Sequence, residues 1–158
     1  MKTLIVYRSK HGCVEKCSKE LADRLSGEAV TVDLKKEKVP DLRRFDNIII
    51  GGSIYAGRIQ KEVTDFWLKN INELREKKIG LFVCGMRDEE SGKTQLDNSF
   101  PEELLSKAVA KGYFGGEVTF SKMNFFERFI IKIVTKNDKD ISNILSENII
   151  KFAQAMNG

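Results

Sequence analysis

The chain has 158 residues and a formal net charge of +4, with 41% hydrophobic and 32% charged residues. This length suffices for one domain with a sizeable core, and we expect residues 1–158 to form a single domain. No apolar run approaches the roughly 20 residues of a membrane span, and the start does not resemble a signal peptide. The sequence therefore predicts a cytoplasmic protein, and the lack of an Arg-rich tract mixed with aromatic residues argues against nucleic-acid binding.

The first informative stretch passes from a short apolar run into an amphipathic pattern. Leu4 to Val6 predict a buried strand, and Gly12 permits a tight turn after it. From Val14 onward, apolar residues recur at three- and four-residue spacing, which predicts a helix. The free N–H groups and the dipole of a helix start favour anions. Residues 9–14 therefore predict a phosphate-binding loop, with an ordinary strand-to-helix turn as the alternative.

Strands and helices are then expected to alternate along the chain. Apolar runs and alternation predict strands at 30–34, 47–51, 79–84 and, more weakly, 117–120. Apolar spacing predicts helices at 63–71, 104–111 and 141–156. Ser99 and Glu102 form a capping-box pattern, and Lys111-Gly112 a helix stop. The alternation predicts an α/β fold, a doubly wound five-stranded parallel sheet with helices on both faces.

Three loops rich in small or polar residues follow the first, third and fourth predicted strands, at 8–14, 52–59 and 85–93. In a doubly wound sheet, ligands bind outside the carboxyl ends of the strands, where the strand order reverses. We therefore expect these loops to meet at one site, which favours the phosphate-loop interpretation.

The three cysteines are too few for a disulfide framework and fit a reducing compartment. Cys13 and Cys17 are four residues apart and share a helix face, but no histidine or second cysteine pair completes a metal site with them. We expect all three to be small core or loop residues, and no metal is predicted. Cys13 begins a helix, which is expected to lower its pKa.

Other phosphate-binding or catalytic classes lack residues that they need. The glycines of 52–57 followed by Arg58 have the spacing of a P-loop, without its lysine and Ser/Thr. Tyr7-Arg8 and Gly51-Gly52 stand at strand ends where a response-regulator receiver has acidic residues. The one histidine, His11, lies within the predicted phosphate loop, so no serine-hydrolase triad is visible.

The loop Ser9-Lys10-His11-Gly12-Cys13-Val14 resembles the FMN-phosphate loop of flavodoxins, which usually reads Ser/Thr-x-Thr-Gly-x-Thr. Ser9 and Gly12 match this pattern, whereas His11 and Val14 replace threonines. Two hydroxyl donors are therefore missing, and backbone N–H groups and Lys10 would have to compensate. The resemblance covers nearly the whole chain and includes two further loops, at 52–57 and 84–86.

The sequence is most similar to the flavodoxin-domain branch that includes menaquinone-dependent protoporphyrinogen oxidase. The similarity lies in the opening Met1-Lys2-Thr3-Leu4-Ile5, the Gly-Gly-Ser-Ile-Tyr-Ala-Gly loop and the segment Phe-Glu-Arg-Phe-Ile-Ile-Lys-Ile at 126–133. The resemblance implies the strand order 2-1-3-4-5 and FMN as the cofactor. The flavin would carry the redox chemistry, so no catalytic residue of the protein is expected.

The resemblance also implies roles for the residues of the three loops. The expected cofactor-binding residues are Ser9, Lys10, His11, Gly12, Cys13, Val14, Ser53, Ile54, Tyr55, Ala56, Gly57, Cys84, Gly85, Met86 and Arg87. Tyr55 is the candidate to stack on the flavin ring, with a surface aromatic as the alternative. Ala56-Gly57 is the candidate for the peptide that turns to bond the reduced flavin.

Two function classes remain open. One is an enzyme that moves electrons from an organic substrate through FMN to a quinone. The other is an electron carrier that serves redox protein partners. Flavodoxin carriers are typically acidic and this chain is basic, which favours the enzyme.

The segment 124–136 combines an aromatic apolar face with Arg128, Lys132 and Lys136 on another strip. It predicts either a helix packed over the sheet edge or a basic amphipathic helix on an anionic membrane surface, where a quinone is found. The second interpretation places the protein at the inner face of a membrane as a peripheral protein.

Overall fold

The computed structural model describes residues 1–118 and 141–158. The first part of the chain forms β1 (Lys2–Arg8), α1 (Cys13–Arg24), β2 (Glu28–Asp33), the 3₁₀ turn η1 (Leu42–Arg44), β3 (Asn47–Tyr55), β4 (Arg58–Ile59) and α2 (Lys61–Leu74). It continues with β5 (Lys78–Cys84), α3 (Glu89–Ser99), α4 (Glu102–Lys107), β6 (Ala110–Tyr113), β7 (Gly115–Val118), β8 (Ile141–Ile144) and α6 (Ser146–Asn157).

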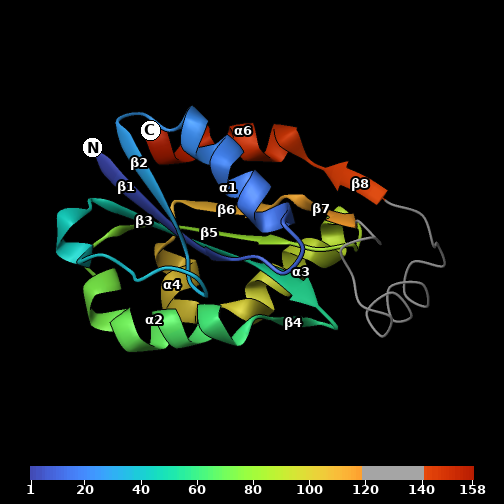
Figure 1. The fold of residues 1–158 in the computed structure, drawn as a ribbon, viewed down its shortest axis with the longest axis horizontal. Coiled ribbons are helices and arrows are strands. Elements are labelled where there is room, and N and C mark those ends of the chain that lie inside the picture. Colours follow the sequence, from blue (N-terminus) through green and yellow to red (C-terminus); the bar gives the residue numbers. More distant parts are fainter. Residues whose placement is uncertain (119–140) are drawn as a thin grey trace.

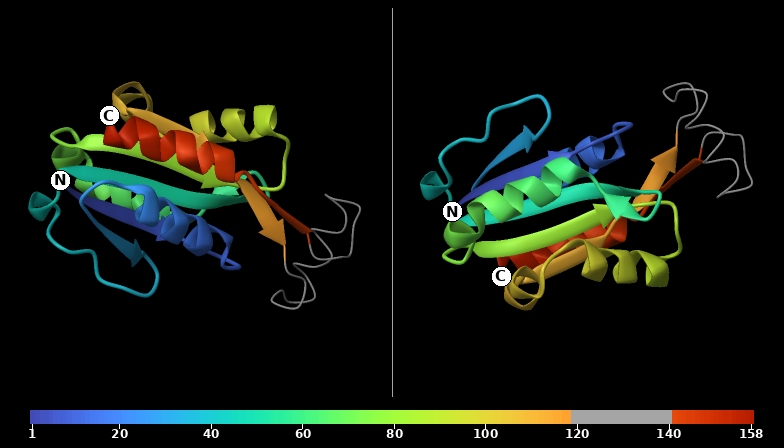
Figure 2. Two further views of the ribbon diagram at one scale, coloured as in Figure 1. Left: turned by 90° about the horizontal axis from the view of Figure 1, so that it is seen from above. Right: turned by 90° about the horizontal axis from the view of Figure 1, so that it is seen from below.

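The main sheet confirms the predicted topology. Five parallel strands lie in the order β2-β1-β3-β5-β6, and the short strand β4 pairs antiparallel with the end of β3. Counting only the parallel strands, this is the order 2-1-3-4-5. Helices α1 and α6 cover one face, and α2, α3 and α4 cover the other (Figures 1 and 2).

The continuous apolar runs of the central strands follow from this burial on both faces. Successive side chains of a strand point to opposite faces, so Leu4 and Val6 join one apolar cluster while Ile5 and Tyr7 join the other. The first cluster packs against α2, α3 and α4, and the second against α1 and α6. The two layers hold the carboxyl ends of β1, β3 and β5 side by side.

The fifth parallel strand is not where the sequence predicted it. It is β6 (Ala110–Tyr113), whereas the stretch predicted at 117–120 begins in β7, which pairs antiparallel with β8. Helix α4 ends at Lys107, so Lys111-Gly112 lies in a strand and is not a helix stop. Gly112 is small because a Cβ there would meet the rings of Phe114 and Phe152, which pack over β6.

Three local predictions also need correction. Ser99 does not cap the following helix; it ends α3, and its hydroxyl donates to the Gln95 carbonyl at 2.6 Å. The stretch 85–93 is only partly a loop, because Asp88 caps a helix by accepting a 2.8 Å hydrogen bond from the Ser91 amide. The closing helix does not start at 141, since Ile141–Ile144 forms β8.

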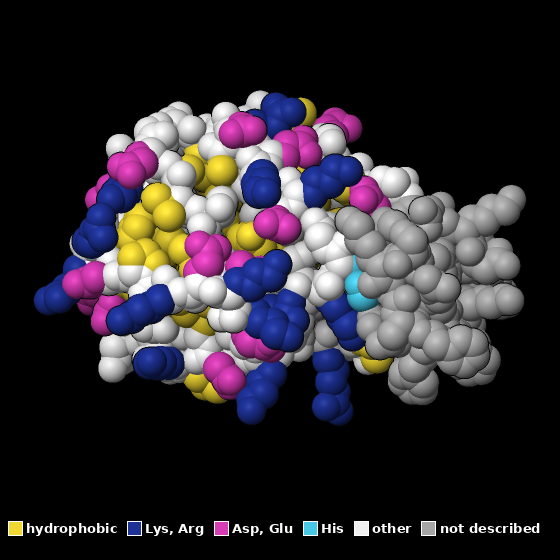
Figure 3. Space-filling view, in the orientation of Figure 1, with side chains coloured by type: hydrophobic (Ala, Val, Ile, Leu, Met, Phe, Trp, Pro, Cys, Tyr) yellow, Lys and Arg dark blue, Asp and Glu magenta, His cyan; other side chains and the backbone are white. Residues whose placement is uncertain are grey.

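On the face shown in Figure 3, Lys and Arg side chains are interspersed with Asp and Glu, and hydrophobic side chains lie between them in small areas. Among the described residues, no helix is both long and apolar enough to cross a bilayer. The predicted amphipathic segment 124–136 lies outside the described residues.

Candidate functional site

The loops at the carboxyl ends of β1, β3 and β5 enclose an open cavity with about 470 Å³ of free space. The cavity is lined by Ser9, Lys10, His11, Cys13, Val14, Ser53, Ile54, Tyr55, Cys84, Gly85, Met86, Gly116 and Glu117. Residues of all three predicted loops therefore lie around one cavity.

The first loop, between β1 and α1, turns on Gly12. Gly12 has φ 92° and ψ −11°, in the left-handed region that favours glycine, and its N–H donates a 3.0 Å hydrogen bond to Ser9 Oγ. The first helical bond runs from the Lys16 N–H to the Gly12 carbonyl. Among the residues that the structure describes, no side chain caps the N-terminus of α1. The amides of the first turn are thus available for an anion at the cavity wall.

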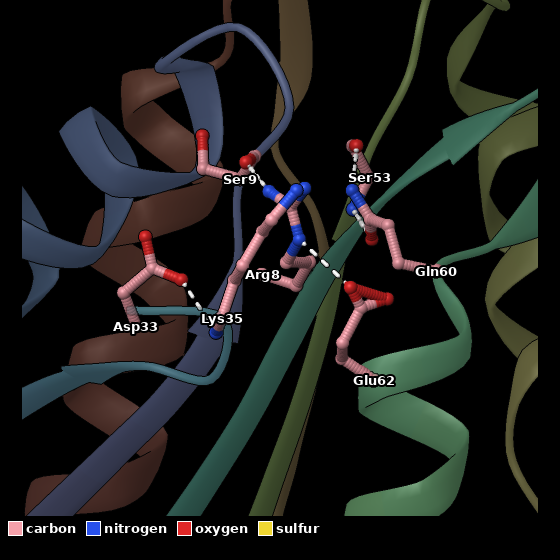
Figure 4. Close-up of polar contacts among 7 residues, drawn as sticks. All are labelled: Arg8, Ser9, Asp33, Lys35, Ser53, Gln60 and Glu62. Atoms are coloured by element: carbon pink, nitrogen blue, oxygen red, sulfur yellow. Dashed lines mark hydrogen bonds and ion pairs between the residues drawn. The ribbon is translucent and has the colours of Figure 1, made fainter. Parts of the chain in front are cut away.

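A partly buried ion pair braces this loop (Figure 4). Arg8 Nε lies 3.1 Å from Glu62 Oε2 at the start of α2, and the Arg8 guanidinium also donates to the Ser9 carbonyl. The Arg8 side chain is 14% exposed and that of Glu62 is 37% exposed, so solvent reaches the pair from the Glu62 side. Arg8 therefore ties the backbone of the loop between β1 and α1 to the start of α2.

Most of the second predicted loop forms a β-hairpin. The predicted loop 52–59 continues β3 to Tyr55 and returns through β4, so that only Ala56 and Gly57 turn. Both have positive φ, 52° and 79°, as a two-residue hairpin turn requires. Alanine is uncommon in this region, and its strained conformation is held by the hairpin.

Gln60 anchors the hairpin to the rest of β3 (Figure 4). Its amide oxygen accepts from the Ser53 N–H at 2.9 Å, and its amide nitrogen donates to Ser53 Oγ at 2.5 Å. Gly52 is small because a Cβ there would come within 2.8 Å of Gln60 Oε1. The position of Tyr55 over the cavity thus depends on a polar clamp at the base of the hairpin.

Lys10 and Tyr55 meet across the cavity mouth. The Lys10 ammonium lies 3.6 Å from the centroid of the Tyr55 ring, a cation–π contact between the first and second loops. The Lys10–Tyr55 contact and the N-terminus of α1 thus border the same cavity. The arrangement suits a ligand with both a planar ring system and an anionic group.

The third loop is held by a side chain that the sequence analysis did not single out. The Tyr113 hydroxyl, from the end of β6, lies 2.7 Å from the Gly85 carbonyl oxygen and 2.6 Å from that of Arg87. The Gly85 N–H donates to the Gly115 carbonyl at 2.9 Å. On the loop side, these contacts involve only backbone groups of residues 85–87. They therefore hold the loop backbone in place independently of the loop side chains.

Gly116 and Glu117 also line the cavity without having been predicted. Gly116 lies against the third loop, where a Cβ would contact the Gly85 carbonyl. Glu117 lies 3.1 Å from Lys16 on α1. The Gly115-Gly116 pair was the available signal, since paired glycines mark turns and close backbone approaches. A fifth strand predicted at 117–120 leaves this pair just outside the strand and gives it no role.

Eleven of the predicted cofactor-binding residues line the cavity, and four do not: Gly12, Ala56, Gly57 and Arg87. Gly12 shapes the first turn and occupies the N-cap position of α1 without a side chain to cap it. Ala56 and Gly57 form the tip of the β3–β4 hairpin. Arg87 supplies the backbone carbonyl that contacts Tyr113.

The fold brings Cys84 to Cys13 and Cys17, although the sequence paired only the last two. Hydrogen bonds from Cys17 and Cys84 hold the pKa of Cys13 well below its usual range. The direction agrees with the expectation from the helix start, but the neighbouring thiols are the main cause. The hydrogen bond with Cys13 is the main cause that raises the pKa of Cys17 and of Cys84.

We expect Tyr113→Phe to loosen the third loop. The variant leaves two backbone carbonyl oxygens without the hydroxyl, which costs about 1–3 kcal/mol of unfolding free energy in a buried setting. Chemical denaturation measures this loss. Tyr7→Phe is the matched control, because Tyr7 is equally buried but bonds Glu15 and not the third loop. Ligand affinity that falls equally in both variants would contradict a specific role for Tyr113.

The same tyrosines predict a stability change at high pH. Burial raises the pKa of Tyr113 and of Tyr7 from 10 to about 12. The folded chain keeps both protons to a higher pH than the unfolded chain does. Their contribution to stability is therefore complete below pH 10 and is lost as the pH rises to about 12. Each single Phe variant should reduce this loss, as measured by denaturation at several pH values.

The family is shown by comparison with known proteins. A flavodoxin-domain family profile matches residues 4–144. The chain therefore belongs to the flavodoxin domain family. This membership agrees with the topology and supports FMN as the cofactor.

Two named relatives share a function. The chain is 22% identical over 144 residues to protoporphyrinogen IX dehydrogenase (quinone) of Escherichia coli (strain K12), with 86% of this chain and 80% of the relative covered. It is also 22% identical to the protein of that name from Leishmania major, covering 85% of this chain and 62% of the relative.

Solved structures share the fold at low sequence identity. Oxidised flavodoxin 1 from Bacillus cereus superposes with a TM-score of 0.61 at 15% identity, covering 99% of this chain and 97% of that one. The flavodoxin of Streptococcus pneumonia TIGR4 gives 0.59 at 19% identity, covering 99% and 97%.

Proposed function

We propose that this protein is an FMN-dependent oxidoreductase that passes electrons to a quinone, of the kind represented by protoporphyrinogen IX dehydrogenase. The observation that carries the proposal is the single cavity on which the uncapped start of α1, the Lys10 ammonium and the Tyr55 ring converge. The weak similarity to the quinone-dependent dehydrogenases supports the kind of electron acceptor.

The first loop would hold the phosphate of FMN. No side chain of residues 1–118 or 141–158 caps the first-turn amides of α1. A phosphate dianion would accept hydrogen bonds from these amides and interact favourably with the helix dipole. The Ser9 hydroxyl accepts from Gly12 and still has its own proton to donate. These donors would compensate for the two hydroxyl groups that are missing at His11 and Val14.

The Tyr55 ring would lie against the flavin ring system. In the structure one face of Tyr55 is in contact with the Lys10 ammonium. Stacking on that face requires the ammonium to leave it, and the phosphate offers Lys10 a stronger, charged partner a short distance away. Lys10 would thus exchange a cation–π contact for an ion pair when the cofactor binds.

The second and third loops would surround the ring edge with backbone groups. Gln60 holds Ser53, and Tyr113 holds the carbonyls of Gly85 and Arg87, so these groups are oriented before a ligand arrives. FMN supplies the electron transfer, while the protein supplies binding and electrostatics.

The identity of the cofactor is the first test. Protein purified from cells should be yellow, and the cofactor released by heating should run as FMN on chromatography, because the loop is built for one phosphate and the chain lacks a Gly-x-Gly-x-x-Gly dinucleotide motif. A colourless preparation that also fails to bind added FMN would refute the cofactor proposal.

The electron acceptor is the second test. Reduced protein should be reoxidised faster by a menaquinone analogue than by a one-electron protein acceptor such as cytochrome c. Turnover of protoporphyrinogen with the same quinone tests the donor. Preferential reoxidation by the protein acceptor, without porphyrinogen turnover, would instead identify an electron carrier.

A further inference from the structure

All three cysteines of the chain meet beneath the first loop. Cys13 and Cys17 lie on the first two turns of α1, and Cys84 ends β5. Their sulfur atoms lie within 4.8 Å of one another, and Cys17 Sγ is 3.9 Å from Cys84 Sγ. All three are buried and none forms a disulfide. The fold therefore builds a compact group of three thiols from distant parts of the chain.

Flavin binding does not account for the whole group. Cys13 and Cys84 line the cavity, but Cys17 does not and is completely buried. Within the described residues, the group holds no carboxylate or imidazole ligand. Its potential ligands are therefore three sulfur atoms, reached from the cavity through Cys13 and Cys84.

The spacing suits one central atom. Three bonds of about 2.3 Å from a pyramidal central atom, the shape that a lone pair imposes, place the sulfurs about 3.5 Å from one another. The observed sulfurs lie within 4.8 Å of one another and would have to move closer by side-chain rotation to reach this arrangement. Sulfur ligands select soft, thiophilic ions.

The net charge of the complex determines which ion the three sulfurs favour. A net charge buried in an apolar setting is costly, so the favoured ion is one whose charge three thiolates neutralise. A complex of a monovalent ion with three thiolates has a net charge of −2. The corresponding Zn²⁺ complex has a net charge of −1, and Zn²⁺ usually has a fourth ligand. We infer that this thiol cluster is a binding site for a trivalent thiophilic metalloid of the arsenic(III) class.

The binding step balances without a further reactant. Arsenous acid, As(OH)₃, exchanges three As–O bonds for three As–S bonds with Cys13, Cys17 and Cys84. The three thiol protons leave with the hydroxyl groups as three water molecules. Arsenic stays trivalent, and no electrons move. The product is an uncharged tris-thiolate, which the buried position favours.

Native mass spectrometry with arsenite tests the inference. The FMN-containing protein, kept reduced with a phosphine, is titrated with arsenite before and after removal of FMN. The mass itself reports the number of sulfur bonds, because a complex with two thiolates retains one hydroxyl and a complex with three does not. We expect one arsenic per chain with three water molecules lost, formed more slowly while FMN is bound.

Cys17→Ala is the decisive variant, because Cys17 lies outside the cavity lining. Loss of one chelating bond should weaken arsenite binding about 100-fold and change the adduct to the two-sulfur mass, with FMN content unchanged. Ser18→Ala is the matched control, since Ser18 is the next residue of α1, equally buried and without a thiol, and it should bind as the unaltered chain does.

Several outcomes would overturn the inference. They are no arsenite adduct in either form of the protein, a two-sulfur adduct in the unaltered chain, or equal affinity in Cys17→Ala. Tighter binding of Zn²⁺ or Cu⁺ than of arsenite in competition would also reject the choice of a trivalent ion. None of these results depends on electron transfer, so they leave the proposed function unaffected.

Discussion

Replacing Gly12 by valine is expected to lower FMN affinity by about 3 kcal/mol, or roughly 100-fold. Gly12 adopts φ 92°, where a β-branched side chain is strongly disfavoured. To relieve the strain, the turn must change, and the bond from the Gly12 N–H to Ser9 Oγ is lost with it. The first-turn amides of α1 then no longer point at a common position for the phosphate.

Fluorescence titration of FMN with the FMN-free protein measures this affinity. The fold should survive, because the strain is a fraction of the 5–15 kcal/mol that stabilises an ordinary domain. Far-ultraviolet circular dichroism checks this. Gly12→Asn is the matched variant, since asparagine tolerates the left-handed region. It should bind more tightly than Gly12→Val if backbone strain dominates. Unchanged affinity in Gly12→Val would show that the phosphate does not sit at this loop.

Gly51→Ala is expected to lower the unfolding free energy by about 3 kcal/mol and the melting temperature by about 10 °C. Gly51 lies in β3, directly paired with Phe82 of β5, and the Phe82 ring folds over it. An alanine Cβ would overlap this ring. Phe82 is completely buried and stacked on Phe114 at 4.7 Å, so it has no free space into which it can move.

A double-mutant cycle separates this overlap from a general effect on the strand. Phe82→Leu shortens the ring side chain and should itself destabilise the core. In Gly51→Ala/Phe82→Leu, however, the loss should be about 1–2 kcal/mol smaller than the sum of the single losses. Calorimetry or urea denaturation supplies the four values. Simple additivity would mean that the Phe82 ring is not what makes glycine necessary at position 51.

Local patterns were informative where one strong signal acted alone. The apolar runs at Leu4–Val6 and Ile48–Ile50 lie in central strands, and the amphipathic spacing from Val14 lies in α1. The loops 8–14, 52–59 and 85–93 were expected to meet, and residues of all three line one cavity. That expectation followed from topology, because parallel strands bring their carboxyl ends to the same edge.

The errors arose where two local patterns competed. Lys111-Gly112 has the composition of a helix stop, yet it lies in β6, because the sheet edge beside β5 offers backbone hydrogen bonds that a longer helix would leave unpaired. The glycine-rich stretch after Ile50 looks like a loop. It extends β3 instead, because β4 folds back to pair with its end.

By itself, the sequence determined the α/β class, because this depends on periodicity along the chain. The strand order followed from the resemblance to flavodoxins, and the binding of a phosphate by residues 9–14 stays a prediction. Only the tertiary structure decided which distant groups meet. Tyr113 reaches the backbone of 85–87, Lys10 lies over Tyr55, and Cys84 joins the thiols of α1. Such contacts depend on how β5, β6 and α1 are placed in space, which no spacing along the chain records.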